Sequence, residues 1–156
     1  MDISWVTERI ALGGGIWNED NMGELVWLGV THVINMQIEF DDRPLARGLP
    51  VEVLHNPTDD DFLPKPAALF QKGVDFALQA LEEPGNKVFI HCAAGVHRAP
   101  MMTLALMRVL GWPKDDALDL IQARRFAVDW ANVYVESVEE FVKSYEASRS
   151  GAGGSR

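Results

Sequence analysis

Cysteine is the scarcest residue type in this sequence, because the chain of 156 residues contains only Cys92. A single thiol excludes an intrachain disulfide and any mechanism in which a second cysteine of the chain resolves the first. Such a chain suits a reducing compartment, so we expect it in the cytoplasm. Positive charge is scarce too: 14 Lys and Arg stand against 23 Asp and Glu, for a formal net charge of −9 at pH 7. This acidity, without a basic stripe, argues against a nucleic-acid partner.

Long hydrophobic runs are also missing. The apolar stretch from Ala99 to Met107 is shorter than the roughly 20 residues that a membrane-spanning helix needs. Asp2, Glu8 and Arg9 leave no apolar segment of the signal-peptide kind near the start of the chain. We therefore expect no membrane partner, and the 47% hydrophobic content is typical of a globular domain.

The most informative stretch is residues 87–102, which predicts a strand, a short loop and a helix. Val88–Ile90 is a short apolar run typical of a buried strand, and the apolar residues after the loop recur at helical spacing. Pro100 suits a helix start, where its missing N–H would have no helical partner in any case. The loop begins with Cys92 and ends with Arg98, and five residues separate them.

This loop has the composition of a phosphate cradle. A loop that closes onto a helix N-terminus gathers backbone N–H groups and the positive end of the helix dipole at one point. Gly95 has the freedom to take the positive φ that turns amides inward, and Arg98 presents a planar fork that matches two phosphate oxygens. The same amides stabilise the thiolate of Cys92, which is then placed to attack phosphorus. We predict Cys92 as the nucleophile and, as the substrate-binding residues, Ala93, Ala94, Gly95, Val96, His97 and Arg98.

An ordinary buried core cysteine is the alternative, and the combination of His91, Cys92, Gly95 and Arg98 makes it the weaker interpretation. His91-Cys92, followed after five residues by Arg98, resembles the signature of the cysteine-dependent protein tyrosine phosphatase superfamily. The chain length and layout resemble its compact dual-specificity branch, over roughly residues 3–145. The loop is similar to that of the phosphatases of regenerating liver. The resemblance implies that His91 orders the loop by hydrogen bonding.

A candidate general acid lies in the stretch Asn56–Pro64, where two prolines bracket Asp59, Asp60 and Asp61. The pattern predicts an ordered loop, and a solvated turn is its plain interpretation. Cleavage of a phosphate ester also needs a proton for the leaving oxygen, and the resemblance implies an aspartate on a mobile loop in that role. When the helix after this loop and the strand that leads to Cys92 are aligned with the family without gaps, Asp60 falls at the position of the family's aspartate.

The rest of the chain alternates short apolar runs with amphipathic stretches. Strands are expected within residues 3–12, 31–36 and 51–54, and helices over about 18–28, 66–82, 99–110, 114–125 and 131–145. This order predicts an α/β fold with a central, mostly parallel sheet flanked by helices, and with the phosphate loop at the carboxyl end of a central strand. The phosphatase domain is expected to span 1–147, and the Ser/Gly-rich residues 148–156 are expected to form a disordered tail.

Several polar segments have plain interpretations. Gly13–Gly15 is expected to be a flexible turn, and residues 37–50 a solvated loop that could also border the pocket. Arg124 and Arg125 complement the dipole at the end of their helix. Asn132 lies near the position where relatives carry an asparagine that braces the phosphate loop, and a helix cap is equally consistent with the sequence.

The resemblance implies a two-step phosphatase that forms a phosphocysteine and needs no metal or cofactor. The chain is too short for the elements that deepen the pocket in larger tyrosine-specific relatives. We therefore expect a phosphorylated protein or peptide as substrate, with phosphotyrosine foremost and phosphoserine and phosphothreonine admitted. Inositol (pyro)phosphate and phosphoglucan remain alternatives, and the oligomeric state stays open. Ala99, where most relatives carry Ser or Thr, leaves a slow-turnover phosphate-binding protein open. A sulfurtransferase is a further alternative, but it needs no general acid, so the loop with Asp59, Asp60 and Asp61 weighs against it.

Overall fold

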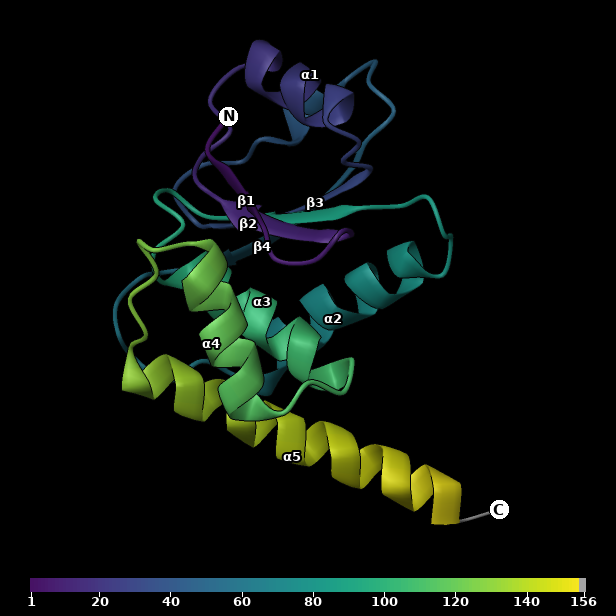
Figure 1. Cartoon of the computed structure of the whole chain (residues 1–156), viewed down its shortest axis with the longest axis vertical. Coiled ribbons are helices and arrows are strands. Elements are labelled where there is room, and N and C mark those ends of the chain that lie inside the picture. Colours follow the sequence, from purple (N-terminus) through teal and green to yellow (C-terminus); the bar gives the residue numbers. More distant parts are fainter. Residues whose placement is uncertain (155–156) are drawn as a thin grey trace.

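A five-stranded sheet forms the centre of the computed structural model, which describes the backbone of residues 1–154 and the side chains of residues 1–150 (Figure 1). The strands are β1 (Ile3–Trp5), β2 (Ile10–Gly13), β3 (His32–Gln37), β4 (Glu52–Thr58) and β5 (Val88–His91). They lie in the order β1-β2-β5-β3-β4, and every neighbouring pair is parallel except β1 and β2. The predicted α/β fold with a mostly parallel sheet is confirmed, and β5, which leads into Cys92, is its middle strand.

Helices cover both faces of the sheet (Figure 1). One face carries α1 (Glu19–Trp27) and the short 3₁₀ helix η1 (Arg43–Ala46), and the other carries α2 (Ala67–Leu81), α3 (Arg98–Val109), α4 (Lys114–Arg124) and α5 (Asn132–Gly154). Side chains alternate between the faces of a strand. Val33 and Phe89 therefore pack into the core beside α1, whereas their neighbours Ile34 and Ile90 pack into the larger core beside the other four helices.

Local signals in the sequence account for the helix ends. Asn18 caps α1, because its side-chain oxygen accepts a hydrogen bond from the Asn21 N–H at 2.8 Å. Gly29, at a φ of +96°, leads the chain out of that helix. Pro66 and Pro113 directly precede α2 and α4, positions from which proline removes no helical hydrogen bond. Helices α1 to α4 thus lie close to their predicted ranges.

Residues 56–58 belong to strand β4 and not to the predicted loop. Asn56 is buried, and its amide donates to the Leu69 carbonyl at 3.0 Å, which ties the strand to α2. Pro57 is exposed, and it is tolerated because β4 is an edge strand, where one side of the backbone needs no ladder partner. The extension carries the chain to Thr58, immediately before the three aspartates.

The last helix is longer than predicted. Helix α5 continues to Gly154, so it covers residues 148–154, for which the sequence predicts a disordered tail; residues 155–156 lie outside the described residues. Arg149 donates to the Tyr145 hydroxyl at 2.9 Å, and its guanidinium lies 5.4 Å from the centre of that ring. This contact between side chains one turn apart supports the helix where the Ser/Gly composition favours disorder.

Candidate active site

Cys92 follows the carboxyl end of β5, and the next residues fold back over its sulfur atom. The N–H groups of Gly95 and Ala99 donate to the sulfur at 3.2 and 3.4 Å. Ala99 lies in the first turn of α3, so the positive end of the helix dipole faces the same atom. The side chain of Cys92 is only 3% exposed. Two backbone N–H groups are therefore directed at the buried sulfur atom.

Gly95 is required by two features of the loop. Its φ is +68°, in the left-handed region that favours glycine. A Cβ at this position would lie 2.7 Å from the backbone of Gly13 and 2.6 Å from the Arg125 guanidinium. Gly13–Gly15, expected as a flexible turn, instead includes the last residue of β2 and runs beside the loop, where the Gly15 N–H donates to the Ala93 carbonyl at 3.0 Å.

Arg98 opens α3 and forms a two-pronged ion pair with Glu39. Its Nη1 and Nη2 atoms donate to the two carboxylate oxygens at 2.6 and 2.8 Å, and Nη1 also donates to the Thr58 carbonyl at 2.9 Å. The guanidinium holds the pKa of Glu39 down, to about 2. Glu39 lies in the segment 37–50, which the sequence predicts to be a solvated loop that could also border the pocket. This contact places the segment beside the site.

One edge of the Arg98 guanidinium is left open. The group has five N–H donors: one on Nε and two on each Nη. Both Nη1 hydrogens have partners, and Nη2 has one partner. Within the described part of the chain, the buried Nε has no hydrogen-bond partner. The Nε and Nη2 edge therefore offers two adjacent donors, the spacing that two oxygens of one phosphate match.

His91 is buried beneath the loop and paired with an aspartate. Its Nε2 lies 2.7 Å from Oδ2 of Asp42, and both side chains are 0% exposed. Asn35 donates to the other oxygen of Asp42 at 3.2 Å. Sequence reasoning missed Asp42, because it lies among charged residues that resemble a solvated loop. The pair anchors the residue directly before Cys92, which agrees with a loop-ordering role for His91.

Arg125 supports the loop from the opposite side. Its Nε and Nη2 donate to the carbonyls of Gly95 and Ala94 at 2.9 and 2.8 Å, and it forms a two-pronged ion pair with Asp2. The guanidinium lowers the pKa of the Asp2 carboxyl. The sequence assigned Arg125 only to the helix dipole. Asn132 is exposed at the first residue of α5, and within the described residues its side chain makes no hydrogen bond to the loop.

Only one of the three adjacent aspartates contacts the phosphate loop. Oδ2 of Asp60 lies 2.9 Å from Nδ1 of His97, and Oδ1 accepts a hydrogen bond from the Tyr134 hydroxyl at 2.9 Å. Asp61 instead pairs with Lys65 at 2.8 Å, which lowers its pKa. The carboxyl group of Asp59 is exposed. The contacts agree with the alignment that selected Asp60.

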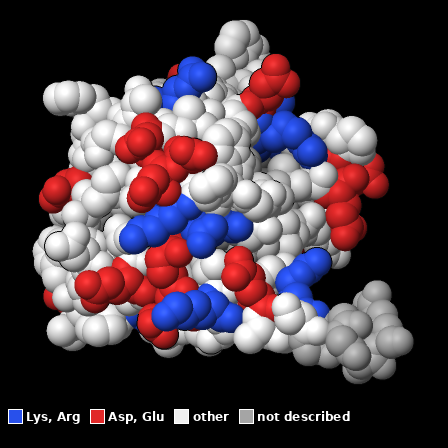
Figure 2. Space-filling view, turned by 60° about the horizontal axis from the view of Figure 1, so that its bottom comes forward, with Lys and Arg blue, Asp and Glu red and all other residues white. Residues whose placement is uncertain are grey.

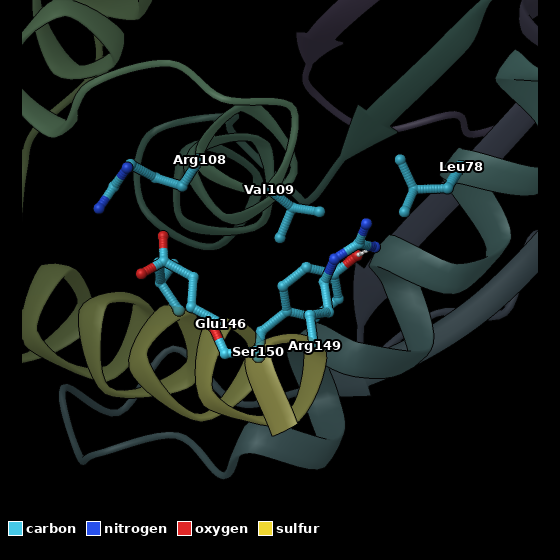
Figure 3. Close-up of a pocket in the computed structure, with 8 residues that line it drawn as sticks. Leu78, Arg108, Val109, Glu146, Arg149 and Ser150 are labelled. Carbon is cyan, nitrogen blue, oxygen red and sulfur yellow. Dashed lines mark hydrogen bonds between the residues drawn. The ribbon is translucent and has the colours of Figure 1, made fainter. Parts of the chain in front are cut away.

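A groove of about 480 Å³ between α2, α3 and α5 lies apart from this loop (Figure 3). Figure 3 shows Val109 pointing into it between Leu78 and Arg108, with Arg149 and Glu146 along the opposite wall. Its lining contains none of the candidate catalytic residues. The candidate catalytic residues lie at the phosphate loop instead.

The surface that carries α5 has mixed charge. Figure 2 shows Lys and Arg side chains interspersed with Asp and Glu, without a continuous basic patch on the described part of this face. Within residues 1–154, no helix combines the length and the apolar character that crossing a membrane requires.

Comparisons with known proteins assign the family. Residues 19–144 match the dual specificity phosphatase catalytic domain. Mouse dual specificity protein phosphatase 13B is 30% identical over 129 residues, which cover 79% of this chain and 64% of that protein. Rat dual specificity protein phosphatase 26 is 36% identical over 90 residues, 56% of this chain and 43% of that protein. The chain belongs to the dual specificity phosphatases, a family of cysteine-dependent phosphatases, and spans less than two thirds of the length of these relatives.

Solved structures have the same fold along almost the whole chain. The crystal structure of PTPMT1 has a TM-score of 0.81 and 26% sequence identity, and the match covers 96% of this chain and 99% of that one. PTPMT1 in complex with PI(5)P gives a TM-score of 0.82 at the same identity. The active form of Tk-PTP, at 20% identity and a TM-score of 0.76, shares the fold. These matches agree with a sheet, helices and phosphate loop arranged as in a compact phosphatase.

Proposed function

We propose that the chain hydrolyses phosphomonoesters on proteins, phosphotyrosine foremost, through a phosphocysteine at Cys92. The open Nε and Nη2 edge of Arg98 carries the proposal, because the buried Nε has no partner in the described residues and lies beside the second hydrogen of Nη2, which suits a bound dianion. The loop amides of residues 93–98 supply further donors around the same oxygens. The single free thiol supports action in a reducing compartment such as the cytoplasm.

The first step transfers the phosphoryl group to the enzyme. The Cys92 thiolate attacks phosphorus in line, so that the S–P bond forms as the bond to the leaving oxygen breaks. Arg98 and the loop amides hold the three other oxygens as their charge redistributes. Asp60 gives its proton to the leaving oxygen.

The second step returns the enzyme to its starting state. Water attacks phosphorus, Asp60 takes a proton from that water, and the S–P bond breaks to release phosphate and the Cys92 thiolate. Ala99 brings only a backbone N–H to the sulfur. The hydroxyl of Thr103, the next candidate donor, donates to the Ala99 carbonyl at 2.8 Å instead. Breakdown of the phosphocysteine therefore lacks a side-chain hydroxyl and is the slower step.

The surroundings of the loop support a substrate with a single phosphate on an aromatic group. Three carboxylates lie close by, on Glu39, Asp60 and Asp129, and the loop residues 93–97 contain no lysine. This charge repels polyanions such as inositol pyrophosphates. The Phe62 ring is 51% exposed and lies edge-on to His97, so an aromatic leaving group has an apolar surface to contact.

An activity screen tests the proposal. Wild type and Cys92→Ser are each assayed with phosphotyrosine peptides, phosphoserine peptides, phosphoglucan, inositol pyrophosphates and phosphoinositides, the last because PTPMT1 is described with PI(5)P. We expect phosphotyrosine to turn over fastest and Cys92→Ser to bind it without turnover, because Arg98 and the loop amides remain. Hydrolysis by Cys92→Ser would overturn the mechanism. A preference for another substrate would keep the mechanism and overturn the substrate class.

A further inference from the structure

The imidazole of His97 lies between two carboxylates that come from different loops. Its Nδ1 is 2.9 Å from Oδ2 of Asp60, and its Nε2 is 3.2 Å from Oδ2 of Asp129. The backbone N–H of Asp129 donates to the Val96 carbonyl at 3.1 Å, which attaches this second carboxylate to the phosphate loop. His97 thus connects the candidate general acid to a residue with no other place in the mechanism.

These contacts fix how many protons the group holds. A neutral imidazole has one N–H, and a carboxylate has none. With Nε2–H donated to Asp129, the contact between Nδ1 and Asp60 needs one more proton. That proton sits either on Nδ1, giving imidazolium and carboxylate, or on Asp60, giving neutral imidazole and carboxylic acid. Both forms store the same transferable proton next to the site where the leaving oxygen must receive it.

The other carboxylate oxygen of Asp60 is also held in place. The Tyr134 hydroxyl donates to Oδ1 at 2.9 Å and accepts from the Phe62 N–H at 3.0 Å. Burial raises the pKa of Tyr134 to about 12, so it remains a donor throughout the neutral range. Phe62 adopts a φ of +58° there, and its ring lies 5.7 Å from the Tyr134 ring and 5.0 Å from the His97 ring. A residue held in this strained region indicates an acid loop fixed by its surroundings.

Most of the charged groups around His97 are negative. Asp60 faces it from the β4–α2 loop and Asp129 from the segment before α5, while Tyr134 of α5 reaches it through Asp60. On its own loop the titratable neighbours are Cys92 and Arg98, and the latter is paired with Glu39. Burial lowers the pKa of His97, but the hydrogen bonds to Asp60 and Asp129 outweigh it and raise the pKa above its ordinary value.

We propose that Asp60 and His97 hold the proton of the phosphatase reaction as a pair, with Asp129 orienting the imidazole. This role rests on the function proposed above. In the first step the shared proton passes from Nδ1 of His97 through Asp60 to the leaving oxygen, so His97 ends neutral and Asp60 ends as a carboxylate. In the second step Asp60 takes a proton from the attacking water and returns one to Nδ1. An isolated aspartic acid is almost fully ionised at neutral pH, whereas a pair that contains an imidazole with a raised pKa keeps its proton to higher pH.

The pH dependence of kcat/KM tests this role of His97 as a positioning and proton-storing residue. Asn at this position retains an amide donor for Asp60 but does not titrate. On an aryl phosphate with a poor leaving group, His97→Asn should move the alkaline limb to lower pH by more than about one unit, because the proton is then held by an aspartic acid alone. Asp129→Asn should move it in the same direction and by less, because the imidazole loses one of its two carboxylates. Asp119→Asn, the same charge change at an exposed residue of α4, is the matched control and should leave the limb in place.

Two outcomes separate this inference from the proposed function. If turnover of the aryl phosphate depends on Cys92 but the limb stays in place in an active His97→Asn, the proton pair is overturned and the phosphatase stands. If no turnover depends on Cys92, the proposed function fails and the pair has no reaction to serve. An NMR titration gives a readout without turnover: the His97 ring should titrate above pH 6.5 in wild type and at lower pH in Asp60→Asn. Equal titration of the two proteins would overturn the pair.

Discussion

The imidazole–carboxylate pair beneath the phosphate loop is buried, whereas the pair beside the loop that carries Asp60, here called the acid loop, is open to solvent. His91 and Asp42 are both 0% exposed, while the side chains of His97 and Asp60 are 19% and 31% exposed. Both pairs join an imidazole to a carboxylate over a similar distance, 2.7 and 2.9 Å. Their surroundings differ, so the two pairs should contribute to different properties of the protein.

Burial decides which property each pair controls. Removing one partner of a buried pair leaves a polar group without water or protein to bond to, so the free energy of unfolding falls. Near the surface, water replaces the lost partner, so the cost in stability is small. The exposed pair instead contacts the proton that the reaction uses. Substitutions beneath the loop should therefore reduce stability, and those beside the acid loop should reduce the rate.

The largest effect on rate, short of loss of the nucleophile, is expected for Asp60→Asn. It should slow turnover of an aryl phosphate with a poor leaving group by roughly 10²–10⁴-fold, because no other group donates the proton. The loss should shrink on a substrate whose leaving group needs no proton. Steady-state kinetics on the two substrates measure both effects, and thermal unfolding should show little change in stability.

Asp59→Asn and Asp61→Asn are the matched controls, since each removes the same charge one residue away. Both should reduce the rate by less than Asp60→Asn, because neither carboxylate contacts His97. A larger loss in either neighbour would mean that the acid is misassigned by one position.

Asp42→Ala should have its main effect on stability. The change leaves Nε2 of His91 buried without its partner, which should lower the free energy of unfolding by about 2–3 kcal/mol. Urea denaturation measures the loss. Asp41→Ala is the control, because Asp41 pairs with Arg43 at the surface and should change stability by less than about 1 kcal/mol. Equal losses in the two variants would contradict the contrast between buried and exposed pairs.

Ala99→Ser should have the smallest effect, and it tests whether a buried change can act on rate alone. A serine hydroxyl would donate to the Cys92 thiolate as it leaves phosphorus. One hydrogen bond to a charged group, worth about 1.5–3 kcal/mol, corresponds to roughly 10-fold or more in kcat. In wild type the phosphocysteine should accumulate, so rapid-quench kinetics should show a burst that fades in the variant. A wild type without a burst, together with an unchanged kcat in Ala99→Ser, would show that the missing hydroxyl is not limiting.

The sequence by itself determined the elements and the central motif of this protein. Each helix end is set by a capping residue or a proline close to it in the sequence, as at Asn18 before α1 and Pro66 before α2. Cys92, Gly95 and Arg98 lie in one short loop, so the spacing of the sequence also sets their spacing in space. Asp60 needed the family resemblance in addition, because its loop is remote in sequence from the cysteine. Residues 56–58 were misjudged, since local composition does not register that a segment continues an edge strand.

Only the tertiary structure decided which side chains surround the motif. Glu39 meets Arg98 across 59 residues, Asp42 meets His91 across 49, and Asp2 meets Arg125 across 123. Periodicity and capping report conformation within a few residues of chain, and carry no information about such pairs. The pairs form because the strand order places β2 and β3 on either side of β5, with β1 beside β2, and because Arg125 after α4 reaches the phosphate loop. Charged residues that resemble a solvated surface in the sequence, such as Glu39 and Asp42, thereby hold Arg98 and His91 in place.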